Sequence, residues 1–274
     1  MHRALRHIGC VRTAVLLSLT SLLSISCEEV IDLDLDQVPQ RIVIEGIVSD
    51  KPSTSRITIS FSESIYKRSG SGNVAGAKVI LSDNTGRSEQ LQEIQAGVFA
   101  PSSVGIAGRE YRLTVTHGGM EYTATSQMPV AMALDSVRWT GSRFNQFFSN
   151  SGSLIYYVSN KPGIEEYCLI KAYNLNESSS KWTLYSDKYS DGKQVALESP
   201  SMNSSGVAMR IELLSIDRAT YDYFVKLREV IGSDGFEIPD ILRLSDFNPK
   251  SNLSNSALGY FSAQSQRDYL VNLR

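Results

Sequence analysis

RITISFS, residues 56–62, decides the fold of this chain. Its apolar residues Ile57, Ile59 and Phe61 alternate with polar ones, so these three side chains point to one face of an extended strand. The same alternation recurs in YRLTVTH, residues 111–117. A period of two residues is typical of a strand with one buried face. We therefore predict a chain rich in half-buried β-strands.

Similar short runs on both sides of these stretches define a first module over residues 41–130. The predicted strands are IVIEGIVS (42–49), RITISFSES (56–64), AKVILSD (77–83), VFAP (98–101), YRLTVTH (111–117) and EYTATSQM (121–128). Turn residues separate them, and no helical period intrudes. This pattern predicts an antiparallel sandwich, and the order of its pieces resembles immunoglobulin-like or transthyretin-like modules of cell-envelope proteins.

A second set of strands predicts another antiparallel β module over residues 131–274. These strands are somewhat longer and richer in tyrosine. They are LDSVRWTG (134–141), SLIYYVSN (153–160), EYCLIKAYN (166–174), KWTLYSDKY (181–189), KQVALES (193–199) and GVAMRIELLSI (206–216). The predicted fold class is therefore mainly β, with two consecutive modules.

The second module is predicted to carry one helix, over residues 217–231. Asp217 is a candidate N-cap, and Gly232 stands just past the end. The apolar residues Tyr221, Phe224, Leu227 and Ile231 recur at spacings of three and four. Such a stripe favours packing of the helix against the sheet, although a groove for a ligand is the alternative.

Residues 1–26 have the features of a lipoprotein signal peptide. Three arginines precede an uncharged apolar run, AVLLSLTSLLSI (14–25), which is too short to span a membrane. The sequence LSISC resembles the lipobox of bacterial lipoproteins, with Ser24 where leucine is usual. We expect acyl chains on Cys27 to anchor the protein to the membrane, with residues 27–40 as an acidic tether.

The residues after Cys27 indicate where the chain is expected to reside. Glu28 and Glu29 resemble the surface-export signal of Bacteroidota lipoproteins, and this resemblance implies a location in the outer membrane, at the cell surface. Loss of residues 1–26 removes three of 27 basic residues and none of 29 acidic ones, so 24 against 29 leaves a net charge of −5. This sign argues against nucleic-acid binding.

No catalytic, metal or cofactor site is predicted. His117, beside two glycines in a predicted solvent-exposed turn, is the one histidine left after the signal is removed. Histidine-based metal sites and most acyl-transfer triads need more. Cys168 is interpreted as a small buried residue in a strand. Glu165, Glu166 and Asp187 are interpreted as charges in turns, so the chain is not expected to be an enzyme.

Aromatic residues in and near the segment 143–153 form a candidate contact surface. Phe144, Phe147 and Phe148 lie among polar and small residues there, and exposed aromatics on a loop mark contacts. The alternative is that they fold back over the end of the sandwich. Trp139 is a further candidate, either stacking on a sugar ring or packing in the core. Trp182 has the same two alternatives.

The tail FNPKSNLSNSALGYFSAQSQRDYLVNL, residues 247–273, carries the most specific resemblance. A Pro-x-x-Asn segment followed by Gly-Tyr-Phe-Ser-Ala, after a tyrosine-bearing helix, is similar to the carboxy-terminal signature of a domain-of-unknown-function family of Bacteroidota lipoproteins. Gly259 is predicted to let the chain turn and insert Tyr260 and Phe261 into the second core.

The resemblance implies a function without assigning functional residues, since the family has no established activity. Its members are typically encoded beside TonB-dependent receptors. It implies a non-catalytic accessory or ligand-binding component of a TonB-dependent outer-membrane uptake system. The alternatives are a structural or adhesive surface lipoprotein and, less favoured, a glycan hydrolase that uses carboxylates.

Overall fold

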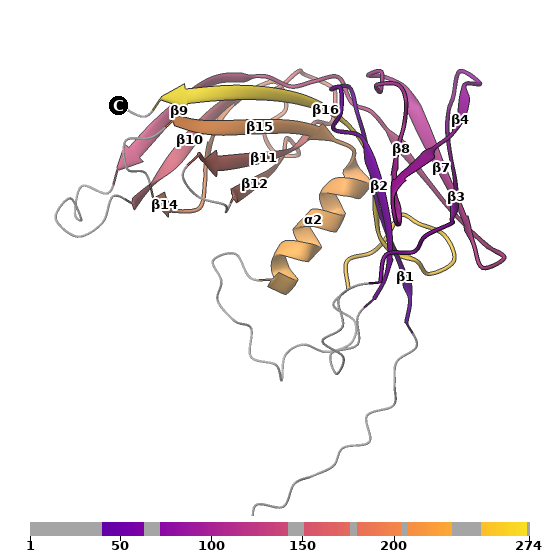
Figure 1. Ribbon diagram of the computed structural model, residues 1–274. Helices are drawn as coiled ribbons and strands as arrows, with labels where there is room; N and C mark the ends of the chain where they lie inside the picture. The colour runs from indigo at the N-terminus through magenta and orange to yellow at the C-terminus, as the bar shows by residue number, and fades with distance from the viewer. Residues whose placement is uncertain are drawn as a thin grey trace, which may run out of the picture. The chain divides into compact units, whose positions relative to one another are not determined.

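The computed structural model describes residues 40–62, 72–141, 151–175, 180–203, 208–231 and 248–272. This part of the chain is mainly β, with the single helix α2 (Arg218–Ile231), as predicted (Figure 1). None of its helices has the length and apolarity that crossing a membrane requires.

One eight-stranded sheet runs through both predicted modules. Its order is β12-β11-β15-β16-β1-β2-β6-β5. The strands are β1 (Ile42–Ser49), β2 (Arg56–Phe61), β5 (Gln92–Gln95), β6 (Val98–Ala100), β11 (Tyr167–Asn174), β12 (Ser180–Ser186), β15 (Ala208–Ile216) and β16 (Leu258–Asn272). Strand β16 pairs in parallel with β1 and antiparallel with β15, so the sheet is mixed and not purely antiparallel.

Two four-stranded sheets complete the fold. The first has the order β4-β3-β7-β8; in the second, β10 pairs with β9, β13 and β14. Their strands are β3 (Lys78–Asp83), β4 (Ser88–Gln90), β7 (Glu110–His117), β8 (Met120–Gln127), β9 (Leu134–Gly141), β10 (Ser151–Ser159), β13 (Gln194–Glu198) and β14 (Met202–Asn203). The sequence did not predict β4, β5, β14 or β16.

Each four-stranded sheet packs on a different half of the eight-stranded sheet. The first core joins side chains of β1, β2, β3 and β7, and the second joins side chains of β10, β11 and β15. Strand β16 contributes Phe261 and Ala263 to the first core and Tyr269 and Val271 to the second. These four residues are all odd-numbered, so both cores lie on one face of β16.

Helix α2 packs on the other face of β16. The ring of the even-numbered Tyr260 lies 4.9 Å from that of Tyr223 and 5.1 Å from that of Phe224. Asp217 caps the helix as predicted, because its Oδ1 accepts a hydrogen bond of 2.8 Å from the backbone N–H of Thr220. The predicted apolar stripe ends early, since Ile231 is exposed.

The prediction for the tail is wrong in two respects. Phe261 is fully buried in the first core and not in the second. Gly259 does have a positive φ, of 92°, but it is the second residue of a 15-residue strand and does not make a turn that inserts two aromatics. In Figure 1 this strand, β16, is the long yellow arrow that runs along β15. The tail therefore belongs to both modules.

Each half of β16 pairs with a strand on one side only. Residues 258–264 pair with β1, and residues 265–272 pair with β15. Side chains replace the missing neighbours. The Asn252 amide accepts from the N–H of Phe261 at 2.9 Å and donates to its carbonyl at 2.8 Å. Ser126 Oγ accepts from the N–H of Ala263 at 2.8 Å. Buried backbone groups are thereby satisfied without a further strand.

Candidate functional site

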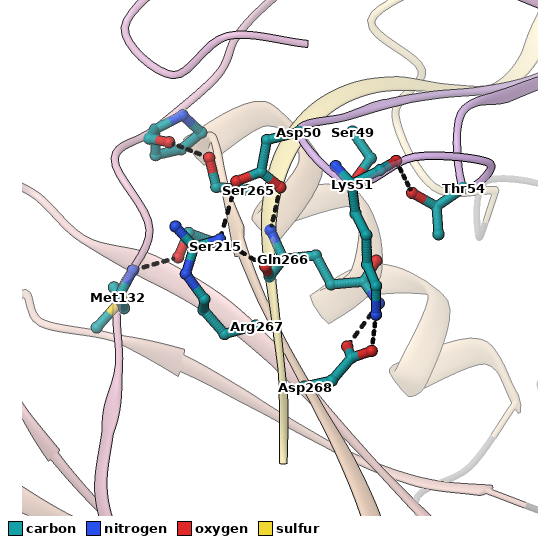
Figure 2. Close-up of polar contacts among 11 residues, drawn as sticks. Ser49, Asp50, Lys51, Thr54, Met132, Ser215, Ser265, Gln266, Arg267 and Asp268 are labelled. Atoms are coloured by element: carbon teal, nitrogen blue, oxygen red, sulfur yellow. Dashed lines mark hydrogen bonds and ion pairs between the residues drawn. The ribbon is translucent and has the colours of Figure 1, made fainter. Parts of the chain in front are cut away.

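A set of polar contacts, drawn in Figure 2, fixes β16 where its partner changes from β1 to β15. Asp50, just past β1, accepts from the N–H of Gln266 at 2.7 Å and from Nη1 of Arg267 at 2.9 Å. Lys51 forms an ion pair with Asp268. The end of β1 is therefore held against β16 beyond the last backbone pair.

The connector between the modules, residues 128–133, is attached at the same place. Ser265 Oγ donates to the carbonyl of Pro129 at 2.6 Å, and the N–H of Met132 donates to Ser215 Oγ at 2.8 Å (Figure 2). Both serines are buried in the eight-stranded sheet. The connector is thus positioned against the sheet by two directed hydrogen bonds.

A pocket of about 340 Å³ opens beside this connector. Its buried apolar residues include Met128, Met132 and Ile216, which are at most 4% exposed. Val130 and Ile164, also in the lining, are 58% and 55% exposed. The volume falls within the range of ~300–1,000 Å³ that is usual for small-molecule sites. Exposed aliphatic residues beside a buried apolar floor mark a surface that can receive an apolar group.

Charged side chains of both signs line the pocket as well. They are Lys161, Glu165, Glu166, Asp217 and Arg218. Tyr167 donates its hydroxyl to Glu165 Oε2 at 2.9 Å. Partial burial, and then the Glu165 carboxylate, raise the pKa of Tyr167 to about 12, so the phenol stays protonated at neutral pH. The pocket thus combines an apolar floor with polar groups that can orient a ligand.

The pocket wall joins the two modules through Asp217. Its Oδ2 accepts from Ser126 Oγ at 2.6 Å, while its Oδ1 caps α2. Ser126 belongs to β8 of the first module and also accepts from Ala263 of β16. One carboxylate therefore ties the start of the helix to the other module.

Most of the sequence-predicted site residues lie outside the described residues. These are Cys27, Glu28, Glu29, Phe144, Phe147 and Phe148. Trp139 lies in β9, is partly buried and packs against the second core. Its indole covers Gly152 on β10 so closely that an added Cβ there would lie 2.5 Å from the ring. Trp139 is not part of the pocket lining.

The remaining histidine and cysteine lie away from the pocket. His117 ends β7 and is partly buried against Phe61, with ring centroids 6.0 Å apart, so the predicted fully exposed position is wrong. Cys168 is fully buried in β11, as predicted. Burial, and then the Glu166 carboxylate, raise the pKa of its thiol to about 12. A thiol in that state is inert at neutral pH.

Two of the three predicted turn charges are buried. Glu165 is exposed, but Glu166 is 9% exposed and Asp187 is 3% exposed. Both flank paired strands, where the register of β11 and β12 brings them together. Sequence alone did not identify these carboxylates or the pocket as notable, because the signal is in their tertiary placement.

The fold and the pocket define a mainly β protein of two sandwich modules that share one continuous sheet. The chain belongs to the family described as Domain of unknown function (DUF4249), whose sequence profile matches residues 28–269. Among solved structures it is similar to a segment of two fibronectin type-III domains from chicken tenascin. That match has 11% identity and a TM-score of 0.22, and it covers 85% of this chain and 99% of the other. A comparison with curated proteins gives no match.

Proposed function

We propose that this protein is a non-catalytic lipoprotein of the bacterial outer membrane, anchored through Cys27 and acting as an accessory or ligand-binding component of TonB-dependent uptake. The observation that carries the binding role is the junction pocket, where exposed Val130 and Ile164 stand beside a buried floor. The lipobox-like sequence and the acidic residues after Cys27 support the location. The inert Cys168 and the absence of histidine from the pocket lining support a non-catalytic role.

The anchor is tested with the variant Cys27→Ala, expressed in the native host. Without a thiol, no acyl chain can be attached, so the protein should move from the membrane fraction to the soluble fraction on ultracentrifugation. Cys168→Ala is the control, because it removes the other cysteine retained after signal cleavage. Retention of the Cys27→Ala protein in the membrane would show that another device anchors it.

The binding role is tested by capturing the tagged lipoprotein in mild detergent and identifying partners by mass spectrometry. We expect a TonB-dependent receptor to be recovered with the wild type. Ile164→Asp places a charge at the pocket and should lower recovery by about tenfold or more, as losses at central apolar contacts do. Ile94→Asp is a matched control, because Ile94 is 58% exposed on β5 and lies outside the pocket.

Two outcomes would count against this proposal. If no receptor is captured and no candidate nutrient raises the melting temperature, a structural or adhesive surface role is favoured instead. If Ile94→Asp and Ile164→Asp reduce capture equally, the pocket is not the contact surface.

A further inference from the structure

Two buried carboxylates lie opposite each other at the end of the β11–β12 pair. The N–H of Asp187 donates to the carbonyl of Glu166 at 3.1 Å, which continues the pairing past Tyr167 and Ser186. Directly opposite residues of an antiparallel pair present their side chains on the same face. Asp187 is 3% exposed and Glu166 is 9% exposed, so both acidic groups occupy one shielded corner.

Neither Glu166 nor Asp187 forms an ion pair with a cation in the described ranges, although Lys161 and Arg218 line the pocket beside Glu166. Glu166 Oε2 accepts a single hydrogen bond, of 2.9 Å, from the backbone N–H of Lys161. The Asp187 carboxylate forms no hydrogen bond or ion pair with any residue in the described ranges. The ammonium of the adjacent Lys188 lies instead over the exposed ring of Tyr189, 5.3 Å from its centroid. Two buried like charges repel each other and lose their hydration, and a bound cation offsets both effects.

Asn160 places a third oxygen at this corner. Its amide nitrogen donates to Tyr185 Oη at 2.5 Å and to the carbonyl of Ser190 at 2.8 Å. Because a carbonyl can only accept, the second bond fixes which end of the amide carries the nitrogen. Oδ1 is then left without a partner in the described part of the chain, although Asn160 is only 7% exposed.

The neighbours of Asn160 show that its amide belongs to the same corner as the carboxylates. Tyr185 lies on β12 two residues before Asp187, which follows the end of that strand and continues its pairing with Glu166, so their side chains share a face. Lys161, which follows Asn160, donates its N–H to Glu166. Hydrogen bonds and strand register therefore bring Asn160, Glu166 and Asp187 to one corner, where Asn160 Oδ1 is the buried oxygen without a partner.

We propose that Asn160 Oδ1 and the carboxylates of Glu166 and Asp187 bind a calcium ion, with water completing the shell. All three ligands are oxygens, which hard cations prefer, and calcium accepts the irregular six to eight contacts that such a corner offers. Magnesium demands near-ideal octahedral geometry and suits it less. Across the described ranges no three His, Cys, Asp or Glu side chains form a metal cluster, so an amide oxygen is needed to complete this set.

The site would also stiffen one wall of the pocket. Residues 160 and 166 bracket the segment that carries Ile164, and both Ile164 and Glu166 line the pocket. A calcium ion held at both ends of this segment would fix the position of Ile164. The inference stands on the buried oxygens and does not rest on the proposed uptake function.

Terbium luminescence tests the site directly on the full chain in detergent, after treatment with a chelator. Terbium replaces calcium, and the Tyr185 ring beside Asn160 is placed to sensitise its emission. We expect saturable emission from the wild type that calcium displaces. It should be lost in Asp187→Asn and in Glu166→Gln, which remove charge without removing bulk. It should persist in Glu198→Gln, which changes an exposed carboxylate on β13.

Thermal unfolding supplies the second readout. Calcium at ~10 mM should raise the melting temperature of the wild type by about 5 °C, and that of Asp187→Asn by less than about 1 °C. If Asp187→Asn does not fold, Glu166→Gln carries the same comparison. Terbium emission that is equal in all variants, or a wild-type melting temperature that calcium leaves unchanged, would overturn the proposal. The proposal would also be overturned if lowering the pH raised the melting temperature of the wild type and calcium did not. That result would indicate that Glu166 and Asp187 share a proton and do not bind a cation.

Discussion

Replacing Gly259 with alanine should lower the free energy of unfolding by roughly 3–5 kcal/mol. Gly259 has a φ of 92°, and a Cβ built on it would lie 2.1 Å from the carbonyl oxygen of Ile44. That atom is backbone of the paired strand β1, so it cannot move aside without breaking the parallel pairing of β1 and β16. Urea denaturation followed by far-UV circular dichroism measures the loss.

Gly86→Ala is the control for Gly259→Ala. Its φ is 89°, nearly the same, but nothing lies within 4 Å of an added Cβ. This variant should therefore lose only the cost of the left-handed conformation, about 1–2 kcal/mol. Equal losses in the two variants would contradict the idea that the contact with β1 makes Gly259 necessary.

Replacing Phe261 with alanine should destabilise both modules together, by about 3–5 kcal/mol. Phe261 is fully buried in the first core, yet its strand also pairs with β15 of the second module. The two tryptophans of the chain, Trp139 and Trp182, both lie in the second module, so their fluorescence reports on that module alone. Their unfolding midpoint should shift to lower urea concentration by as much as the midpoint from circular dichroism.

Leu270→Ala is the matched control on the same strand. Leu270 is 69% exposed, so its truncation should change stability by less than about 0.5 kcal/mol. If Phe261→Ala produces an early transition in circular dichroism while the tryptophan transition stays in place, the two modules unfold independently. In that case β16 does not couple them.

The alternating strands of both modules were predictable because their burial follows the sequence period. Ile57 and Ile59 are fully buried and Arg56 is exposed, as the alternation in RITISFS requires. The helix cap was predictable for a similar reason, since Asp217 binds a backbone group only three residues away. Local rules suffice where the partner is local.

Strand β16 was not predicted because the residues in its middle are polar and are nevertheless buried. Ser262, Gln264, Ser265 and Gln266 are at most 7% exposed, which reverses the usual relation between polarity and exposure. Its backbone is satisfied by side chains far away in the sequence, Ser126 and Asp50, as well as by Asn252, nine residues before Phe261. No local window of sequence contains both members of the pairs that Ser126 and Asp50 form.

The pocket and the buried acidic pair escaped prediction for the same reason. Met128, Ile164 and Ile216 are far apart in the sequence and meet only when both modules have formed. Glu166 and Asp187 stand among turn residues in the sequence, and only the pairing of β11 with β12 buries them. Burial of a charge is a property of the assembled fold and leaves no local pattern.

The long reach of β16 also orders the folding of this chain in time. Strand β1 ends at Ser49, and its parallel neighbour begins at Leu258, so the ribosome must add some 210 residues before the pair can form. At ~5–20 residues per second this takes on the order of ten to forty seconds. Until then the first core lacks Phe261 and the sheet has an open edge. The first module therefore cannot be completed until β16 has been synthesised.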